Sequence, residues 1–320
     1  MPAVPSPATI FVTGVSGFSG AWIARALLGN GYAVRCTVRS EKAAYIADLF
    51  KVHGDRFESV IVPDIAKAVL NDSISAVVHV AGVANLSATD VSDIMGPNTD
   101  CVLSLLESTL RHGPHGLVLK NVKHFVYMSS AQAMLGHEDL FHVYTEVVGG
   151  QALYRASKVL AERAVINVVE EHKKEIGWDA TRIVPAWWKA FKDFNLSSKI
   201  LYQHLTTPCD DDRVNDDVSD YVDVRDVADA FVAALKVEAA GNERFILDAG
   251  AYTFQDLYDA VHATAPGLQG VVLGNPSAPP FSFPGVFCDS CKAKRVLQLK
   301  QFRTLGECAV DTLKSIRGRL

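Results

Sequence analysis

The sequence lacks the features that mark membrane proteins and nucleic-acid-binding proteins. No apolar run in its 320 residues reaches the roughly 18 residues that cross a membrane, and Met1–Pro7 does not have the charged and apolar parts of a leader. The formal net charge is −5 and the chain contains no basic stripe that would attract phosphates. We therefore expect a cytoplasmic protein that binds neither a membrane nor nucleic acid.

The cysteines are too few and too scattered for a disulfide framework. The chain has six, and only Cys288 and Cys291 show C-x-x-C spacing. That pair lacks a second C-x-x-C or histidines at zinc spacing, and a basic helical stretch follows it instead of a thioredoxin-like βαβ unit. The sequence thus predicts no metal site, and we interpret these cysteines as incidental.

Strand and helix patterns alternate along most of the chain. The hydrophobic content of 49% is enough for a full core. Apolar periodicity predicts strands at 8–13, 33–38, 57–62, 74–81, 122–128, 181–185 and 244–248, and helices at 20–28, 98–111, around 151–168, 293–297 and 305–316, with a further strand and helix within 221–231. This alternation is typical of an α/β fold with a doubly wound parallel sheet.

The domain organisation follows from the same pattern. We expect residues 1–185 to form a dinucleotide-binding domain of the Rossmann type, to which 221–248 returns. Residues 186–320 would then form mainly a smaller C-terminal substrate-binding region.

The first predicted turn has the glycine spacing of a dinucleotide-binding loop. Thr13-Gly-Val-Ser-Gly-Phe-Ser-Gly20 lies between the first strand and the first helix. Glycines in this place let the backbone approach a pyrophosphate at the N-terminus of a helix. The predicted cofactor contacts in the turn are Gly14, Ser16, Gly17, Phe18 and Gly20.

The end of the second strand favours NADPH over NADH. Arg39 and Lys42 lie there, where dinucleotide folds place an acid for a ribose 2′-hydroxyl or a base for a 2′-phosphate. The alternative is two solvated charges at the start of a helix, a place that usually favours acids.

Later strand ends supply further predicted cofactor contacts. Asp64, which Ile65 follows, is placed to accept a hydrogen bond from an adenine amino group or to cap a helix, and the sequence leaves both open. Ala81 and Gly82 follow the fourth strand and Pro185 ends the sixth, at the edge where open α/β sheets bind ligands. His79, within the fourth strand, is predicted to be a packed core histidine.

Tyr154 and Lys158 are the predicted centre of the chemistry. Four residues apart on a helix, they share one face, and they lie off its apolar stripe. A nearby cation favours the phenolate, so we expect Lys158 to lower the pKa of Tyr154. Ser130, after the fifth strand, offers a second donor to a substrate oxygen, although paired serines are also common in turns.

The aromatic segment after the sixth strand has two interpretations. Trp187 and Trp188 either line an apolar substrate pocket or pack between the domains. The sequence does not separate these alternatives.

Together these motifs resemble the extended short-chain dehydrogenase/reductases, in particular the branch of the dihydroflavonol reductases and the yeast methylglyoxal/aldehyde reductases. The resemblance rests on T-G-x-x-G-F-x-G at 13–20, V-R-S-x-K at 38–42, V-P-D-I at 62–65, S-S-A at 129–131, Y-x-x-S-K at 154–158 and S-x-K-A-K-x-V-L at 290–297. It implies a catalytic set of Ser130, Tyr154 and Lys158, with Lys158 also binding the cofactor ribose. Asn98 matches the family's helical asparagine only loosely, and 189–191 departs from the family's Phe-Gly-Pro turn.

The predicted function is the reduction of an apolar or aromatic aldehyde or ketone with NADPH, by a monomer or homodimer. One alternative is an NAD-dependent nucleotide-sugar epimerase or dehydratase, which Arg39 and Lys42 disfavour. Another is a non-catalytic dinucleotide-sensing regulator, which would not need Ser130, Tyr154 and Lys158 together.

Overall fold

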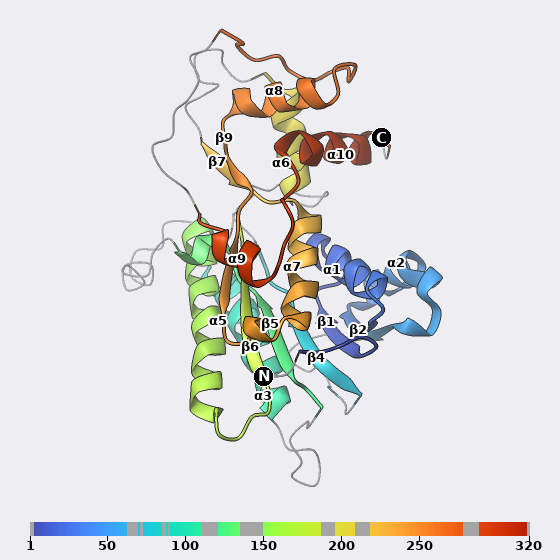
Figure 1. The fold of residues 1–320 in the computed structure, drawn as a ribbon, viewed down its shortest axis with the longest axis vertical. Coiled ribbons are helices and arrows are strands. Elements are labelled where there is room, and N and C mark those ends of the chain that lie inside the picture. Colours follow the sequence, from blue (N-terminus) through green and yellow to red (C-terminus); the bar gives the residue numbers. More distant parts are fainter. Residues whose placement is uncertain are drawn as a thin grey trace.

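The computed structural model describes residues 3–62, 70, 73–84, 88, 90–110, 121–134, 150–186, 196–208, 218–277 and 288–318. Within these ranges a seven-stranded parallel sheet has the order β3-β2-β1-β4-β5-β6-β8 (Figure 1). The strands are β1 (Thr9–Thr13), β2 (Ala33–Val38), β3 (Phe57–Ile61), β4 (Ile74–His79), β5 (His124–Met128), β6 (Asp179–Pro185) and β8 (Arg244–Leu247). The predicted doubly wound parallel sheet is confirmed.

Successive residues of the strands face opposite sides of the sheet, as strand geometry requires. Val12 and Val78 belong to one apolar core, whereas their neighbours Phe11 and Val77 belong to the other. Both faces are therefore buried, which explains why the strands are apolar throughout.

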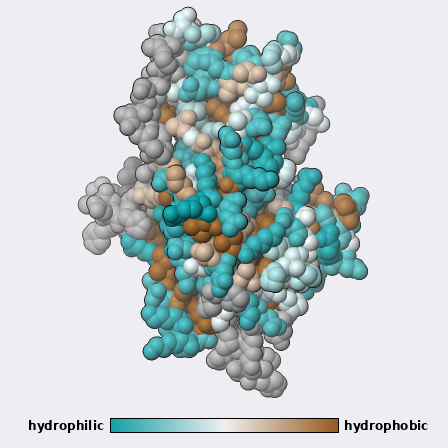
Figure 2. Space-filling view, viewed as in Figure 1, coloured by the Kyte–Doolittle hydropathy of each residue, from teal (hydrophilic) through white to brown (hydrophobic). Residues whose placement is uncertain are grey.

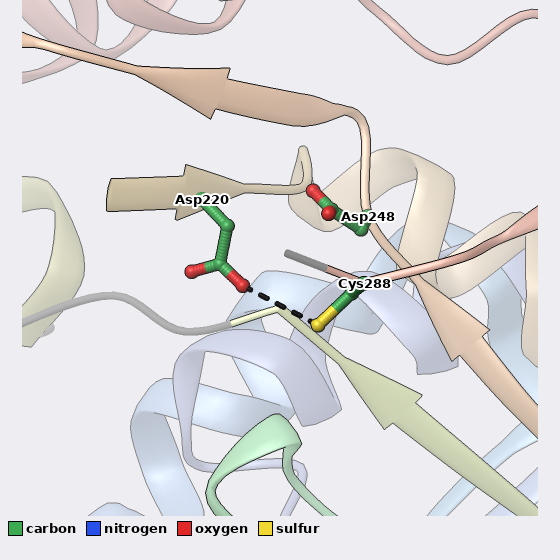
Figure 3. Close-up of side chains that lie close together, drawn as sticks. All are labelled: Asp220, Asp248 and Cys288. Carbon is green, nitrogen blue, oxygen red and sulfur yellow. Dashed lines mark hydrogen bonds between the residues drawn. The ribbon is translucent and has the colours of Figure 1, made fainter. Parts of the chain in front are cut away.

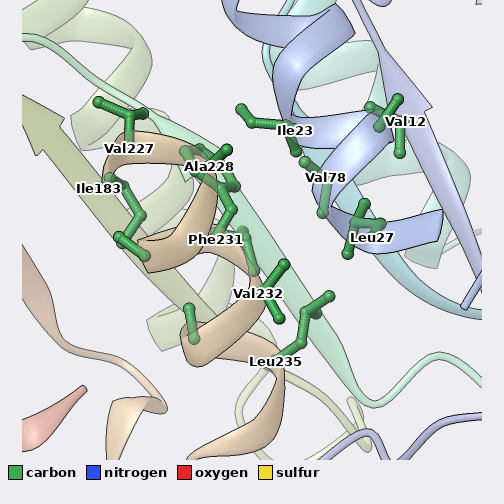
Figure 4. Packing of buried hydrophobic residues seen from close by; sticks show 14 of the residues in the cluster. Val12, Ile23, Leu27, Val78, Ile183, Val227, Ala228, Phe231, Val232 and Leu235 are labelled. Atoms are coloured by element: carbon green, nitrogen blue, oxygen red, sulfur yellow. The ribbon is translucent and has the colours of Figure 1, made fainter. Parts of the chain in front are cut away.

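One face of the sheet is covered by α1 (Phe18–Gly29), α2 (Ser40–Phe50) and α7 (Val224–Lys236). Figure 4 shows Ile23 and Leu27 of α1 near Val12 and Val78, and Phe231 of α7 close to the strands. The long helix α5 (Gly150–His172) packs with α3 (Met95–Leu110) on the other face. Two helical layers thus hold the sheet edges in fixed positions.

A smaller unit lies above the sheet in the view of Figure 1. It contains α6 (Leu196–Thr206), α8 (Phe254–Thr264), α10 (Leu305–Arg317) and the antiparallel pair of β7 (Ser219–Tyr221) with β9 (Gly250–Tyr252). Leu205, Tyr258 and Leu313 belong to its separate core. The short helix α9 (Cys291–Val296) instead packs near β8, through Ala293 in the core of the sheet.

Most predicted elements are confirmed, and the differences have physical reasons. All seven strands of the sheet lie within two residues of their predicted ends. The helix predicted from 98 begins at Met95, because Pro97 is tolerated in a first helical turn. The strand predicted at Tyr221 pairs with β9 outside the main sheet. The helices α6 and α8 were not predicted from the sequence, although Thr253 and Asp256 form a capping box at the start of α8.

Hydrophilic residues cover much of the face in Figure 2, with hydrophobic residues in scattered patches between them. Across the described ranges, no helix combines the length and the apolar character needed to cross a membrane.

Candidate active site

The glycine turn is closely packed against neighbouring backbone at the start of α1. Gly14 has a φ of 76°, and a Cβ there would lie 2.7 Å from the backbone nitrogen of Ala81. A Cβ on Gly20 would lie 2.1 Å from the carbonyl oxygen of Gly14. Gly17 is the N-cap of α1 and no side chain caps the helix, so its first N–H groups can bind an anion. These features fit the pyrophosphate of a dinucleotide.

Thr13 joins the ends of β1 and β4 beside this turn. Its Oγ1 lies 2.8 Å from Nδ1 of His79 and accepts hydrogen bonds from the backbone nitrogens of Val80 at 3.1 Å and Ala81 at 3.2 Å. The one hydroxyl proton therefore goes to His79. Burial, and next the charge of Lys158, lower the pKa of His79 to about 3, so the prediction of a packed core histidine is confirmed.

A groove of about 1140 Å³ extends from the glycine turn toward α2 and α10. Its lining includes Ser16, Gly17, Phe18 and Lys42. Arg39 is predicted to bind the 2′-phosphate together with Lys42. It is two-thirds exposed and forms an ion pair with Glu41 at 3.0 Å. A ligand phosphate bound by Arg39 would therefore compete with this carboxylate.

The helix α5 brings Tyr154 and Lys158 to the ends of β4 and β5. Lys158 is buried, and its Nζ donates a hydrogen bond to the carbonyl oxygen of Met128 at 3.2 Å. The same nitrogen lies 5.5 Å from the centre of the Tyr127 ring and 5.9 Å from that of Tyr154. A Cβ on Gly82 would lie 3.4 Å from it. The predicted cofactor residue Gly82 and the predicted catalytic Lys158 thus share one site.

Ser130 reaches the same place from the end of β5. It is buried, and its side chain forms a hydrogen bond with Tyr154. Its Oγ also accepts from the backbone nitrogen of Gln132 at 3.2 Å. Arg155 of α5 donates to Oε1 of Gln132 at 2.8 Å, which holds the turn against the helix. The three predicted catalytic residues therefore lie together.

The expected lowering of the Tyr154 pKa by Lys158 was wrong. Burial raises the pKa of Tyr154, and the hydrogen bond with Ser130 opposes the rise. Burial also lowers the pKa of Lys158 to about 8, against the charge of Glu162. Desolvation is the largest effect on both groups because the phenol and the ammonium are both buried. Tyr154 consequently keeps its proton at neutral pH.

Residues 10–249 match the profile described as the NAD dependent epimerase/dehydratase family. The chain belongs to this family. It is 27% identical to the NADPH-dependent methylglyoxal reductase GRE2 of Saccharomyces cerevisiae, over 96% of this chain and 98% of the relative. It is 29% identical to the ketoreductase azaE of Aspergillus niger, over 96% of this chain and 97% of the relative.

The fold agrees with the family. The crystal structure of yeast methylglyoxal/isovaleraldehyde reductase Gre2 complexed with NADPH superposes with a TM-score of 0.78, at 24% identity, and covers 98% of this chain and all of that one. The family predicted from the sequence motifs is therefore confirmed.

Asn98, which the sequence matched only loosely to the family's helical asparagine, lies beside Gly82 and Ser157. Its Oδ1 accepts from the backbone nitrogen of Val83 at 2.7 Å, and its Nδ2 donates to the Val83 carbonyl and to Oγ of Ser157, both at 2.9 Å. Asn98 thus links α3 and the segment after β4 to Ser157 of α5, the residue immediately before Lys158. Asn98 is a polar residue that is buried within a helix, and buried polar side chains generally form hydrogen bonds of this kind.

One further predicted cofactor contact, Pro185, lies at the strand end where the sequence placed it. Pro185 ends β6, half-buried and in register with Leu247 of β8. Four further predicted residues lie outside the described ranges: Asp64, Ile65, Trp187 and Trp188.

A second polar cluster contains Asp220, Asp248 and Cys288 (Figure 3). Their potential ligand atoms all lie within 4.8 Å of one another, and Sγ of Cys288 donates to Oδ2 of Asp220 at 3.7 Å. Burial raises the pKa of Asp248 to about 6 and that of Cys288 to about 12. Asp248 also accepts from the backbone nitrogen of Gly250 at 2.9 Å. The cluster is therefore held by hydrogen bonds within the chain.

Proposed function

We propose that the protein reduces an aldehyde or ketone to an alcohol with NADPH, and that the carbonyl compound has apolar or aromatic substituents. The observation that carries this proposal is the meeting of Ser130, Tyr154 and Lys158 at the carboxyl edge of the sheet, beside the glycine turn. Two relatives named as a methylglyoxal reductase and a ketoreductase support the same chemistry.

Bound NADPH would supply the hydride for the carbonyl carbon. The backbone of Gly14, Gly17 and Gly20 would hold the pyrophosphate, and Arg39 with Lys42 would bind the 2′-phosphate. The other proposed cofactor contacts are Ser16, Phe18, Asp64, Ile65, Ala81, Gly82, Tyr154, Lys158 and Pro185.

The chain itself would manage the proton and the charge on oxygen. Ser130 donates a hydrogen bond to the carbonyl oxygen as negative charge develops there. Tyr154 then transfers its proton to that oxygen, and its raised pKa ensures that this proton is present at neutral pH. The Lys158 ammonium binds the ribose and stabilises the phenolate that remains.

The substrate region and the setting are further parts of the proposal. Residues 1–185, with 221–248, would form the dinucleotide-binding domain, and 186–320 would form mainly the substrate-binding region. Trp187 and Trp188 would provide an apolar wall. We infer a cytoplasmic monomer or homodimer that acts on a small molecule and binds no nucleic acid.

The decisive experiment follows reduced nicotinamide with a panel of aldehydes, ketones and nucleotide sugars. We expect NADPH consumption with apolar carbonyl compounds and stoichiometric formation of alcohol, abolished in Tyr154→Phe. Conversion of a nucleotide sugar without net consumption of the cofactor would instead indicate an epimerase. Cofactor binding without turnover of any compound would indicate a regulator.

A further inference from the structure

Glu162 is a buried carboxylate that the proposed reaction does not use directly. It lies on α5 four residues after Lys158, so the two side chains leave the same face of the helix. The residue is 7% exposed. A carboxylate buried to this degree is costly unless other groups pair with it. Its partners therefore indicate its role.

Two strands and the turn after β5 supply the partners of Glu162. The Oγ of Ser129, just after β5, donates a hydrogen bond to Oε2 at 2.6 Å. The Nε of Arg244 on β8 donates to Oε1 at 2.5 Å, and the Nε of Arg182 on β6 lies 3.8 Å from the same oxygen. Since Arg182 and Arg244 are register partners on adjacent strands, the carboxylate joins α5 to both strands and to the turn after β5.

The bond to Ser129 bears on the proposed catalytic serine. Ser129 immediately precedes Ser130, and Met128, immediately before it, accepts the hydrogen bond from Nζ of Lys158. Glu162 and Lys158, one helical turn apart, thus hold two successive residues of the turn that presents Ser130. Loss of the Glu162 bond would remove the side-chain anchor of this turn and leave Ser129 with the hydrogen bond from its backbone nitrogen to the carbonyl oxygen of Ile183 at 2.8 Å.

Glu162 also places a negative charge near Lys158. Burial lowers the pKa of Lys158 to about 8, and the charge of Glu162 acts in the opposite direction. The other described titratable groups that face Lys158 are Tyr127, Tyr154 and His79. All three are neutral at neutral pH, because burial raises the phenol pKa values and lowers the imidazole pKa.

We propose that Glu162 is a positioning residue of this site, which fixes the Ser130 turn through Ser129 and acts as the buried counter-charge of Lys158. The inference rests on the proposed reductase function. A carboxylate with a merely structural role would change the stability of the fold, whereas this role also changes the pH dependence of the site.

The test replaces Glu162 with glutamine, which keeps the shape and removes the charge. Glu170→Gln is the matched control, because Glu170 lies on the same helix, is two-thirds exposed and pairs with Lys173 at 3.0 Å. We expect the alkaline limb of kcat/KM, where Lys158 loses its proton, to move to lower pH by about one unit or more in Glu162→Gln. At neutral pH kcat should fall by about tenfold. The control should match the wild type in both.

Two further variants separate the two parts of the role. Ser129→Ala removes the bond to the turn and keeps the charge, so kcat should fall while the alkaline limb stays in place. Glu162→Asp restores the charge and should return the limb toward its wild-type position. A folded Glu162→Gln protein with the wild-type limb would overturn the proposal. If that variant does not fold, wild-type kcat in Ser129→Ala overturns it.

NADPH affinity, measured against pH by cofactor fluorescence without a carbonyl compound, separates this inference from the proposed function. If the wild type binds NADPH but reduces nothing on the panel, the reductase function fails. The pH at which NADPH affinity declines still reports on Lys158, and Glu162→Gln should lower that pH. An unchanged decline in the variant would refute the role of Glu162 alone.

Discussion

Replacing Thr13 with valine should destabilise the protein where β1 and β4 meet. Valine has nearly the shape of threonine, so the change removes hydrogen bonds without opening a cavity. The bonds are those of Oγ1 with Nδ1 of His79 at 2.8 Å and with the backbone nitrogens of Val80 at 3.1 Å and Ala81 at 3.2 Å.

The expected loss follows from the groups that remain without a partner. A buried polar group that loses its hydrogen bond costs about 1 to 3 kcal/mol. His79 is fully buried, whereas Val80 and Ala81 are half-buried and their bonds are longer. We therefore expect a decrease in the free energy of unfolding of about 3 kcal/mol, most of it from His79.

Thr37→Val is the matched control for this prediction. Thr37 lies on the neighbouring strand β2 and is buried, but its Oγ1 has no hydrogen-bond partner among the described residues. Valine there should be neutral or stabilising, because it removes an unsatisfied hydroxyl. Urea unfolding of both variants measures the difference. If Thr13→Val lies within about 0.5 kcal/mol of Thr37→Val, the hydroxyl does not join the two strands as described.

Three other changes test the cofactor, the polar cluster and the substrate wall. Arg39→Ala should reduce the NADPH preference about tenfold or more, since charge-assisted bonds contribute about 1.5 to 3 kcal/mol, and an unchanged ratio of kcat/KM for NADPH and NADH would make Arg39 a surface charge. The pKa of Asp248 rises from 3.8 to about 6 on folding, so the folded protein favours the protonated carboxyl. The free energy of unfolding should therefore fall by up to about 3 kcal/mol as the pH rises from about 4 to about 6. Urea unfolding at both pH values should show this slope in the wild type and not in Asp248→Asn, and equal slopes would contradict it. In the wild type, kcat/KM should rise with the apolar size of the substrate by about 0.8 kcal/mol per buried methylene, and alanine at Trp187 or Trp188 should flatten this rise. If the rise persists in both variants, these residues do not line the substrate pocket.

The sequence predicted the parts of the site that depend on local patterns. The glycine turn was recognisable because Gly14 and Gly20 must lack a Cβ where backbone segments approach. The pairing of Tyr154 and Lys158 followed from helical spacing alone. The strand ends were predictable because parallel strands that are buried on both faces are apolar throughout.

The remaining features depend on residues that are distant in the chain. Glu162 looks like a surface charge in the sequence, since its partners Ser129 and Arg244 lie on other elements. The pKa of Tyr154 was predicted in the wrong direction. The helical spacing shows that Lys158 is near, but it does not show that both groups are buried. Tertiary packing determines both properties.

The most direct test of the central claim is kcat for a reducible carbonyl compound in Tyr154→Phe, with the Kd for NADPH measured on the same sample. The phenol hydroxyl serves the transition state, so kcat should fall far more than tenfold while the Kd for NADPH stays near the wild-type value. Phenylalanine keeps the ring in place and removes only the hydroxyl that donates the proton, so kcat should fall by at least this much. A kcat above about a tenth of the wild-type value, a loss below about 1.4 kcal/mol, would contradict Tyr154 as the proton donor.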